Sequence, residues 1–337
     1  MKMRLRRTRA AAVFSAMAIL VNGAALAQFT NPRPMQRATD EYQALLMQRA
    51  YGNLERAAAE AHSSASLIDD GQPRLAAIYS GTAGCVCGSQ LTEELWKIRG
   101  ERLREWRDQY PKSVTARVAL ASFPLRYGWF LRGGGYSNTV SPDAWKEFSS
   151  QVEAARNALN DLDADAKNDP GWFGAMLDVA IAQQWPRDRF NALYEQAGRE
   201  HPDYFPIYFA GASYYSPKWY GSIEDLRTFI GRAADATRSK WGDTLYARLT
   251  WSETAAFDAG RADWKRMKAG FERIVRDFPD PWNINNYARF ACRVRDWPTV
   301  ERLAGQIGDK PVATAWYGDQ RHYLRCRQAA KEATPKQ

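Results

Sequence analysis

RYGWFLRGGGYSNTVSPDAWKEF occupies residues 126–148 and separates two segments of helical character. Three successive glycines interrupt the helical pattern of residues 114–131, because glycine lowers helix stability and permits positive φ angles. The next helix can begin after Ser141 as N-cap, with Pro142 in its first turn and Asp143 at the positive end of its dipole. The stretch therefore predicts two helices joined by a glycine-rich turn.

The remainder of the chain repeats this alternation of helix and break. Apolar residues recur at helical spacing, as with Tyr42, Leu45 and Leu46, and no run alternates as a strand would. Asp169 and Asp280 each precede a proline and repeat the helix-start signal. With a capping box at residues 222–225, we expect helices at about residues 40–50, 54–62, 73–79, 91–109, 114–131, 142–162, 245–257, 264–278, 282–294, 300–307 and 313–330.

Three predicted helix ends share one pattern, in which a charged pair is followed by a ring and a proline. The pattern occupies residues 107–111, 199–202 and 276–279, and a new helix follows each of them closely. Such punctuation is typical of stacked helical hairpins. The unit that starts at Pro281 fits the tetratricopeptide pattern best, with the small Ala288 where two helices cross. The sequence predicts an all-α fold, an irregular TPR-like αα-superhelix.

The first 27 residues are predicted to be a secretory signal peptide. Basic residues precede an apolar, small-residue stretch, and Ala25-Leu26-Ala27 is a cleavage site of the A-x-A type. The alternative is an uncleaved membrane anchor, although the apolar stretch is short for a span of about 20 residues. We expect a periplasmic or secreted protein without stable membrane insertion, with a flexible lead-in at 28–39, one helical repeat domain at 40–330 and a disordered tail at 331–337.

The charge pattern does not indicate a nucleic-acid partner. The chain carries a net charge of +9, and cleavage would remove five basic residues and no acidic ones, which leaves +4. Basic and acidic residues alternate along the predicted helices, as in RGERLREWRDQ, which is typical of solvated helix faces.

The glycine-rich turn is the first candidate binding site. Consecutive glycine amides before a helix can form an anion-binding nest, and Arg132 would suit a carboxylate or phosphate. The alternative is a structural connection, with Trp129 and Trp145 buried and Arg132 paired to a helix end. The candidate ligand contacts are Arg132, Gly133, Gly134, Gly135, Tyr136, Asn138 and Trp145.

An aromatic cluster beside Pro217 is the second candidate. Stacked rings on a helical surface could bind a glycan or an extended peptide. The alternative is that they cover the ends of adjacent helices, as buried tyrosine and tryptophan often do. The rings are Tyr214, Tyr215, Trp219 and Tyr220.

Four cysteines in an exported chain suggest disulfides. Cys292 and Cys326 are 34 residues apart, close to one repeat, so they should lie on neighbouring helices and form a structural bridge. Cys85 and Cys87 would form a strained local ring that is easily reduced. The alternatives for this second pair are a quiet loop staple, an interchain link or a thiol–disulfide activity.

The sequence contains no recognisable catalytic or metal-binding motif. His62, His201 and His322 are scattered, and no ligand accompanies any of them at helical spacing. We therefore predict no catalytic residue, no metal and no cofactor.

The stretch WFLRGGGYSNTV at residues 129–140 resembles a family of bacterial TPR-like helical proteins known as a domain of unknown function. Members carry W-x-x-R-G-x-G-Y-A-x-T-V, then a G-W pair and a phenylalanine, which here correspond to Trp145 and Phe148. Ser137 and Ala144 depart from the pattern. The likeness extends over residues 42–251, through Asp70-Gly71 before Ile78-Tyr79, HPDYFPIYF at 201–209 and PKWYGS at 217–222. It implies the fold and leaves the chemistry open.

These observations predict a non-enzymatic binding or scaffold module of the bacterial envelope, with a peptide, protein or cell-wall component as its partner. The alternative is an all-α enzyme that acts on envelope glycans, with the aromatic cluster as its sugar subsites.

Overall fold

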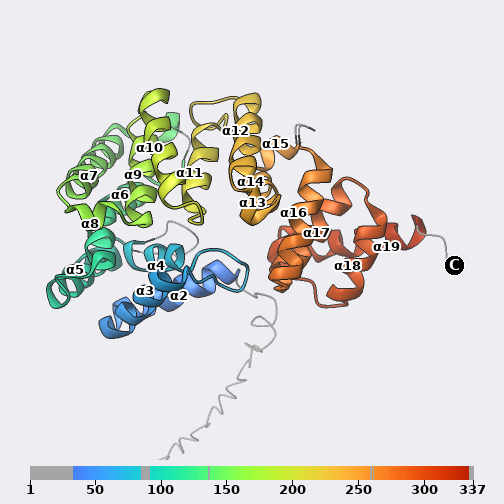
Figure 1. Cartoon of the computed structure of the whole chain (residues 1–337), viewed down its shortest axis with the longest axis horizontal. Coiled ribbons are helices and arrows are strands. Elements are labelled where there is room, and N and C mark those ends of the chain that lie inside the picture. Colours follow the sequence, from blue (N-terminus) through green and yellow to red (C-terminus); the bar gives the residue numbers. More distant parts are fainter. Residues whose placement is uncertain (1–32, 85–91, 136, 259, 261, 334–337) are drawn as a thin grey trace, which may run out of the picture.

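A computed structural model describes residues 33–84, 92–135, 137–258, 260 and 262–333 of the chain (Figure 1). The predictions for the signal peptide, for Tyr136 and for the Cys85–Cys87 pair fall outside these residues. Within them every regular element is a helix, and the extended structure is limited to one isolated bridge between Leu67 and Pro73. The all-α class is thus confirmed, whereas the match to tetratricopeptide repeats stays a prediction.

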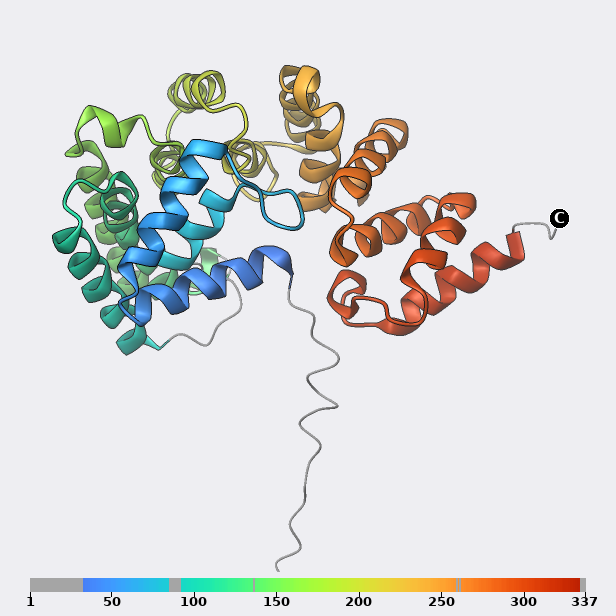
Figure 2. The same ribbon diagram turned by 60° about the horizontal axis from the view of Figure 1, so that its bottom comes forward.

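Successive helices follow one another around an arc, with the C-terminal helices at its far end (Figures 1 and 2). The first half contains α2 (Pro34–Met47), α3 (Tyr51–Ser64), α4 (Arg74–Ala83), α5 (Glu93–Gln109), α6 (Val114–Arg132), the 3-10 turn η1 (Ser137–Thr139), α7 (Pro142–Asn160), α8 (Ala164–Lys167) and α9 (Pro170–Ala182). The second half contains α10 (Arg187–Glu200), α11 (Pro206–Tyr214), α12 (Ile223–Ala236), α13 (Arg238–Trp241), α14 (Thr244–Ser252), α15 (Thr254–Asp258), α16 (Trp264–Asp277), α17 (Pro281–Arg293), α18 (Trp297–Ile307), η2 (Ala313–Trp316) and α19 (Gln320–Ala333).

The helix starts follow the predicted capping chemistry. The side chains of Ser141, Asp169 and Asp280 each accept a backbone N–H at the start of the helix that follows. Ser222 and Asp225 form the predicted capping box of α12. Each cap satisfies a backbone donor that the first helical turn leaves without an intrahelical partner.

Three segments differ from prediction. Helix α2 begins at Pro34, inside the expected lead-in at 28–39, because proline is compatible with the first helical position. The helix expected at 313–330 is divided, because Tyr317 and Gly318 both have positive φ angles. Its second part, α19, reaches Ala333, so residues 331–333 of the expected tail are helical, and the rest of that tail lies outside the described residues. The helix expected at 245–257 is interrupted at Glu253.

The connection between α3 and α4 links distant parts of the chain. The carbonyl of Asp70 accepts hydrogen bonds from Arg248 Nη2 and from Asn283 Nδ2, the latter at 3.2 Å. Gly71 adopts φ +81°, and a Cβ there would lie 2.4 Å from the ring of Phe278. A simple solenoid has contacts between neighbouring units only. Here residues separated by 178 and 213 positions touch, so the loop ties the N-terminal helices to the C-terminal half.

The predicted bridge between α17 and α19 is confirmed, since Cys292 and Cys326 form a disulfide with Cα atoms 5.8 Å apart. In the part of the chain that the structure describes, no helix combines the length and apolar character needed to cross a membrane.

Candidate functional site

The glycine-rich turn uses Arg132 internally. Its Nη1 donates to the carbonyls of Gly133 at 3.0 Å and Gly135 at 3.1 Å. Its guanidinium also lies over the rings of Trp129 and Trp145, 5.3 and 4.7 Å from their centroids. Such cation–π contacts hold an arginine in place. The side chain therefore braces its own turn at the end of α6.

The two stretches singled out in the sequence meet at one surface. The ring of Trp219 stands edge-on to Trp129 at 5.7 Å, and Trp219 is 38% exposed. Asn138 lies in the exposed turn η1, and the indole N–H of Trp145 donates to the carbonyl of Ser137 at 3.3 Å. We call the group formed by Trp129, Arg132, Trp145 and Trp219 the glycine-turn surface.

The other rings of the aromatic cluster serve packing. Tyr214 and Tyr215 are each 3% exposed. Their hydroxyls donate to the carbonyl of Trp185 at 2.8 Å and to Asn191 Oδ1 at 2.6 Å. The half-buried Tyr220 donates to the carbonyl of Ile181 at 2.6 Å. These rings close the ends of α9 and α10, and Trp219 is the exposed member of the cluster.

A cavity of about 460 Å³ lies where α3, the α3–α4 connection, α8, the start of α9 and the α10–α11 connection come together. Its polar wall combines carboxyl groups and imidazoles from widely separated parts of the chain. We call it the histidine–aspartate pocket, with the polar lining residues His62, Asp165, Asp169, Glu200, His201 and Asp203.

Asp169 is the central residue of this pocket. As N-cap of α9 it accepts, through Oδ1, the backbone N–H of Gly171 at 2.6 Å and the hydroxyl of Tyr79 at 2.8 Å. Its Oδ2 lies 3.3 Å from Nε2 of His62, and the side chain is 1% exposed. Burial raises the pKa of the carboxyl group, while the His62 charge and the hydrogen bonds favour the ionised form.

Burial also shifts the pKa values of two neighbours of Asp169. Burial, helped by the Asp169 charge, raises the pKa of the Tyr79 hydroxyl well above its ordinary value. Burial lowers the pKa of His201, whose ring packs on Phe173 with centroids 5.4 Å apart. Nε2 of His201 is buried and has no hydrogen-bond partner among the described residues. The pocket thus holds polar atoms that a ligand could satisfy.

The electrostatics of the pocket favour a positive ligand group. Four carboxyl groups and two imidazoles line it, and none of the described lining residues is a lysine or arginine. Asp203 is already engaged by Lys240 and by the indole N–H of Trp241. Among the described residues, the three-residue grouping with metal-compatible donor spacing lies elsewhere, at Cys292, His322 and Cys326. The described lining of this pocket is therefore predominantly acidic.

The expectation that the histidines are scattered is wrong for His62 and His201, because both line one pocket. The sequence does not reveal this pocket, because His62 and His201 belong to different helical hairpins and meet only in the folded chain. The available signal was Asp169 before Pro170, which we interpreted as a helix start alone. No short sequence motif marks a group of side chains that come from such distant parts of the chain.

Comparison with known protein families, with curated proteins and with solved structures gives no match. The resemblance of residues 129–140 to a TPR-like family therefore stays a prediction.

Proposed function

We propose that the protein is a non-enzymatic binding module of the bacterial envelope whose peptide, protein or cell-wall ligand inserts a cationic group into the histidine–aspartate pocket. Its envelope location rests on the predicted signal peptide at 1–27. The cationic group is an ammonium or guanidinium, as on a lysine or arginine side chain, a free amino terminus or an amino sugar.

The buried carboxyl group of Asp169 carries the proposal. A buried charge is costly unless it is paired, and the neighbour at Oδ2 is His62, which carries a charge only when protonated. An ammonium from a ligand would supply a permanently charged partner, and no lysine or arginine among the described lining residues does so. The unpartnered Nε2 of His201 adds an acceptor when the imidazole is neutral.

The His62–Asp169 contact favours one alternative, an all-α enzyme that acts on envelope glycans. A carboxylate that orients an imidazole is a common arrangement for general acid–base catalysis. A glycan enzyme would need exposed rings as sugar subsites, and Tyr214 and Tyr215 of the aromatic cluster are buried. Turnover distinguishes the two functions: release of reducing ends from a soluble cell-wall glycan, lost in a His62→Ala variant, would support the enzyme.

The binding proposal can be tested with the three histidines of the chain as reporters. Imidazole resonances are followed while the peptide Ala-Lys-Ala is added, with Ala-norleucine-Ala as the uncharged comparison. We expect saturable shifts of His62 and His201 with the lysine peptide only. His322 lies outside the pocket lining and serves as the internal reference.

A pair of variants on α10 sharpens the test. Glu200 lines the pocket and is exposed, so Glu200→Gln should leave the fold intact and weaken binding about two- to fivefold, the worth of one exposed ion pair. Glu195→Gln removes the same charge from the same helix outside the pocket lining and should bind like the wild type. Equal shifts with both peptides, or equal losses in both variants, would contradict the proposal.

A further inference from the structure

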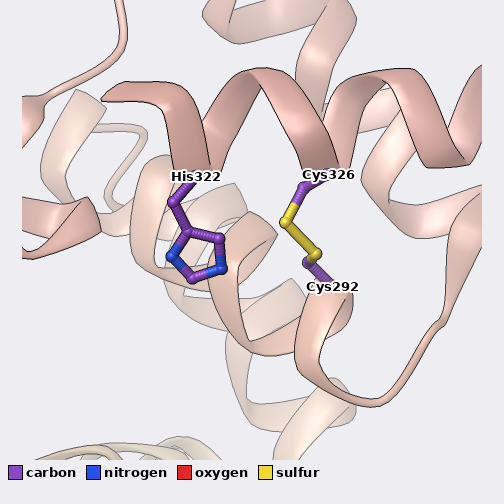
Figure 3. A group of neighbouring side chains, drawn as sticks. All are labelled: Cys292, His322 and Cys326. Carbon is purple, nitrogen blue, oxygen red and sulfur yellow. A yellow bond between two sulfur atoms is a disulfide. The ribbon is translucent and has the colours of Figure 1, made fainter. Parts of the chain in front are cut away.

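Three soft or borderline metal donors lie together at the C-terminal end of the arc. Figure 3 shows the ring of His322 beside the sulfur atoms of Cys292 and Cys326. One donor atom from each residue lies within 4.8 Å of the other two. The expectation that no histidine has a ligand at helical spacing is wrong for His322, because Cys326 follows it by four residues on α19. The third donor, Cys292, comes from α17.

The backbone holds this group in place independently of the disulfide. His322 and Cys326 are four residues apart on α19, so they occupy the same helix face. Nearby on that helix, the ring of Tyr323 is buried and packs on Trp316, and its hydroxyl donates to the carbonyl of Gly308 at 2.7 Å. The donors therefore stay close when the sulfur–sulfur bond is broken.

We propose that, after reduction of the disulfide, Cys292, Cys326 and His322 bind one copper(I) ion. An external dithiol supplies two electrons and two protons, so that its own sulfurs become a disulfide and the two cysteines become thiols. Binding of Cu⁺ then releases the two thiol protons, and the two thiolates and one neutral imidazole complete a three-coordinate site. While Cys292 and Cys326 are joined in the disulfide, neither can supply a thiolate, so the site cannot form.

Thiolate ligands select soft ions, copper(I) and zinc(II) foremost. Structural zinc sites are closed by four protein ligands, and a zinc ion held by three needs a water in the fourth position. The described residues place three donors here, which is a complete set for three-coordinate copper(I). Two thiolates leave a copper(I) site with a net charge of −1 and a zinc site neutral. The charges of Arg289, Arg293 and Arg325 act on the His322 ring and would stabilise the negative complex. Asp319 acts in the opposite direction and is itself paired with Arg325 at 3.6 Å.

The two cysteines of the disulfide differ in exposure. Cys326 is 3% exposed, whereas Cys292 is half-buried. A thiolate reductant can therefore attack the sulfur of Cys292 and release the sulfur of Cys326 as the leaving thiolate. Reduction converts the link between α17 and α19 into a metal site, and reoxidation releases the ion.

The proposal is tested with the mature chain in a Cys85→Ser/Cys87→Ser background, so that the remaining thiols are those of Cys292 and Cys326. The protein is reduced, freed of reductant under anaerobic conditions and titrated with copper(I) against a chromophoric chelator. We expect one equivalent bound by the reduced protein and none by the oxidised protein. Zinc(II) should bind more weakly in the parallel titration.

The His322→Ala variant separates metal binding from disulfide formation. It should still form the Cys292–Cys326 bridge but bind copper(I) at least about tenfold more weakly, since even outer-shell ligand partners are worth about 10- to 100-fold. Gln328→Ala, which removes an exposed side chain from the same helix, is the control and should bind normally. Unchanged affinity in His322→Ala, stronger binding of zinc, or a reduced protein that unfolds without binding copper would each overturn the proposal.

Discussion

The glycine-turn surface and the histidine–aspartate pocket differ in where their charged groups find partners. Arg132 donates to two carbonyls within three residues of itself and lies between two tryptophan rings of the same stretch. Asp169 draws its partners from far away, including a hydroxyl 90 residues distant. In the glycine-turn surface, Arg132 finds its hydrogen-bond partners within its own turn. The partners of Asp169 in the pocket come together only when helices α3, α4, α9 and α10 are packed against one another.

This difference has energetic consequences. A charge that is braced by its own exposed turn contributes little to the stability of the whole molecule. A buried carboxyl group that joins three helices contributes much more, because removal strands the donors that it satisfies. In the pocket, Asp169 Oδ2 and His201 Nε2 are buried without a hydrogen-bond partner among the described residues, and in the glycine-turn surface this holds for Nε of Arg132.

The largest expected effect is a loss of stability in Asp169→Ala, and a comparison variant shows how much of that loss comes from the helix cap alone. Asp169→Ala removes the cap of α9 and strands the buried Tyr79 hydroxyl, so we expect a loss of about 3 kcal/mol in the free energy of unfolding. Asp280→Ala is the matched control, because Asp280 also precedes a proline and caps α17 through the N–H of Trp282 at 2.7 Å. Its long-range contact is with the partly exposed Arg37 at 3.5 Å, an ion pair that contributes little. Its expected loss is about 1 kcal/mol. Urea unfolding measures both, and equal losses would show that the network adds nothing beyond the cap.

A smaller effect is expected within the glycine-turn surface. Gly133 combines φ +77° with ψ 173°, a region that is nearly exclusive to glycine, so Gly133→Ala should cost about 1–3 kcal/mol in strain. A Cβ at Gly133 or Gly134 meets no atom within 4 Å, and Gly134 does not require a positive φ. Gly134→Ala should therefore change the stability by less than about 0.5 kcal/mol. Equal destabilisation in thermal unfolding would mean that the turn constrains both positions.

Local signals made parts of this fold predictable. The Ser-Pro and Asp-Pro helix starts and the Ser222–Asp225 capping box depend on a few adjacent residues, and the structure has them where the sequence predicts. The Cys292–Cys326 bridge followed from a spacing of one repeat. Each of these features is decided within one turn or one hairpin.

The pocket could not be predicted in the same way. Its assembly depends on how α3 and α10 pack against the start of α9, and those positions follow from core packing rather than from any short motif. Likewise, nothing local announces that the carbonyl of Asp70 will meet Arg248 and Asn283. At the N-terminus, Pro34 begins a helix inside the segment that the sequence predicts to be a flexible lead-in.

The smallest effect concerns the charge state of the pocket. Burial lowers the pKa of His201 and the Asp169 charge opposes that shift, so imidazole titration by NMR should find His201 below its ordinary 6.5 and lower still in Asp169→Asn. Because the folded pKa is depressed, His201 contributes stability that is present above pH 6.5 and lost as the pH falls through its folded pKa. The pKa of His322 is also lowered by burial, and it should not change in Asp169→Asn. An unchanged His201 pKa in Asp169→Asn would mean that Asp169 is uncharged in that pH range. The pocket would then lack the buried negative charge that the proposed cationic ligand needs.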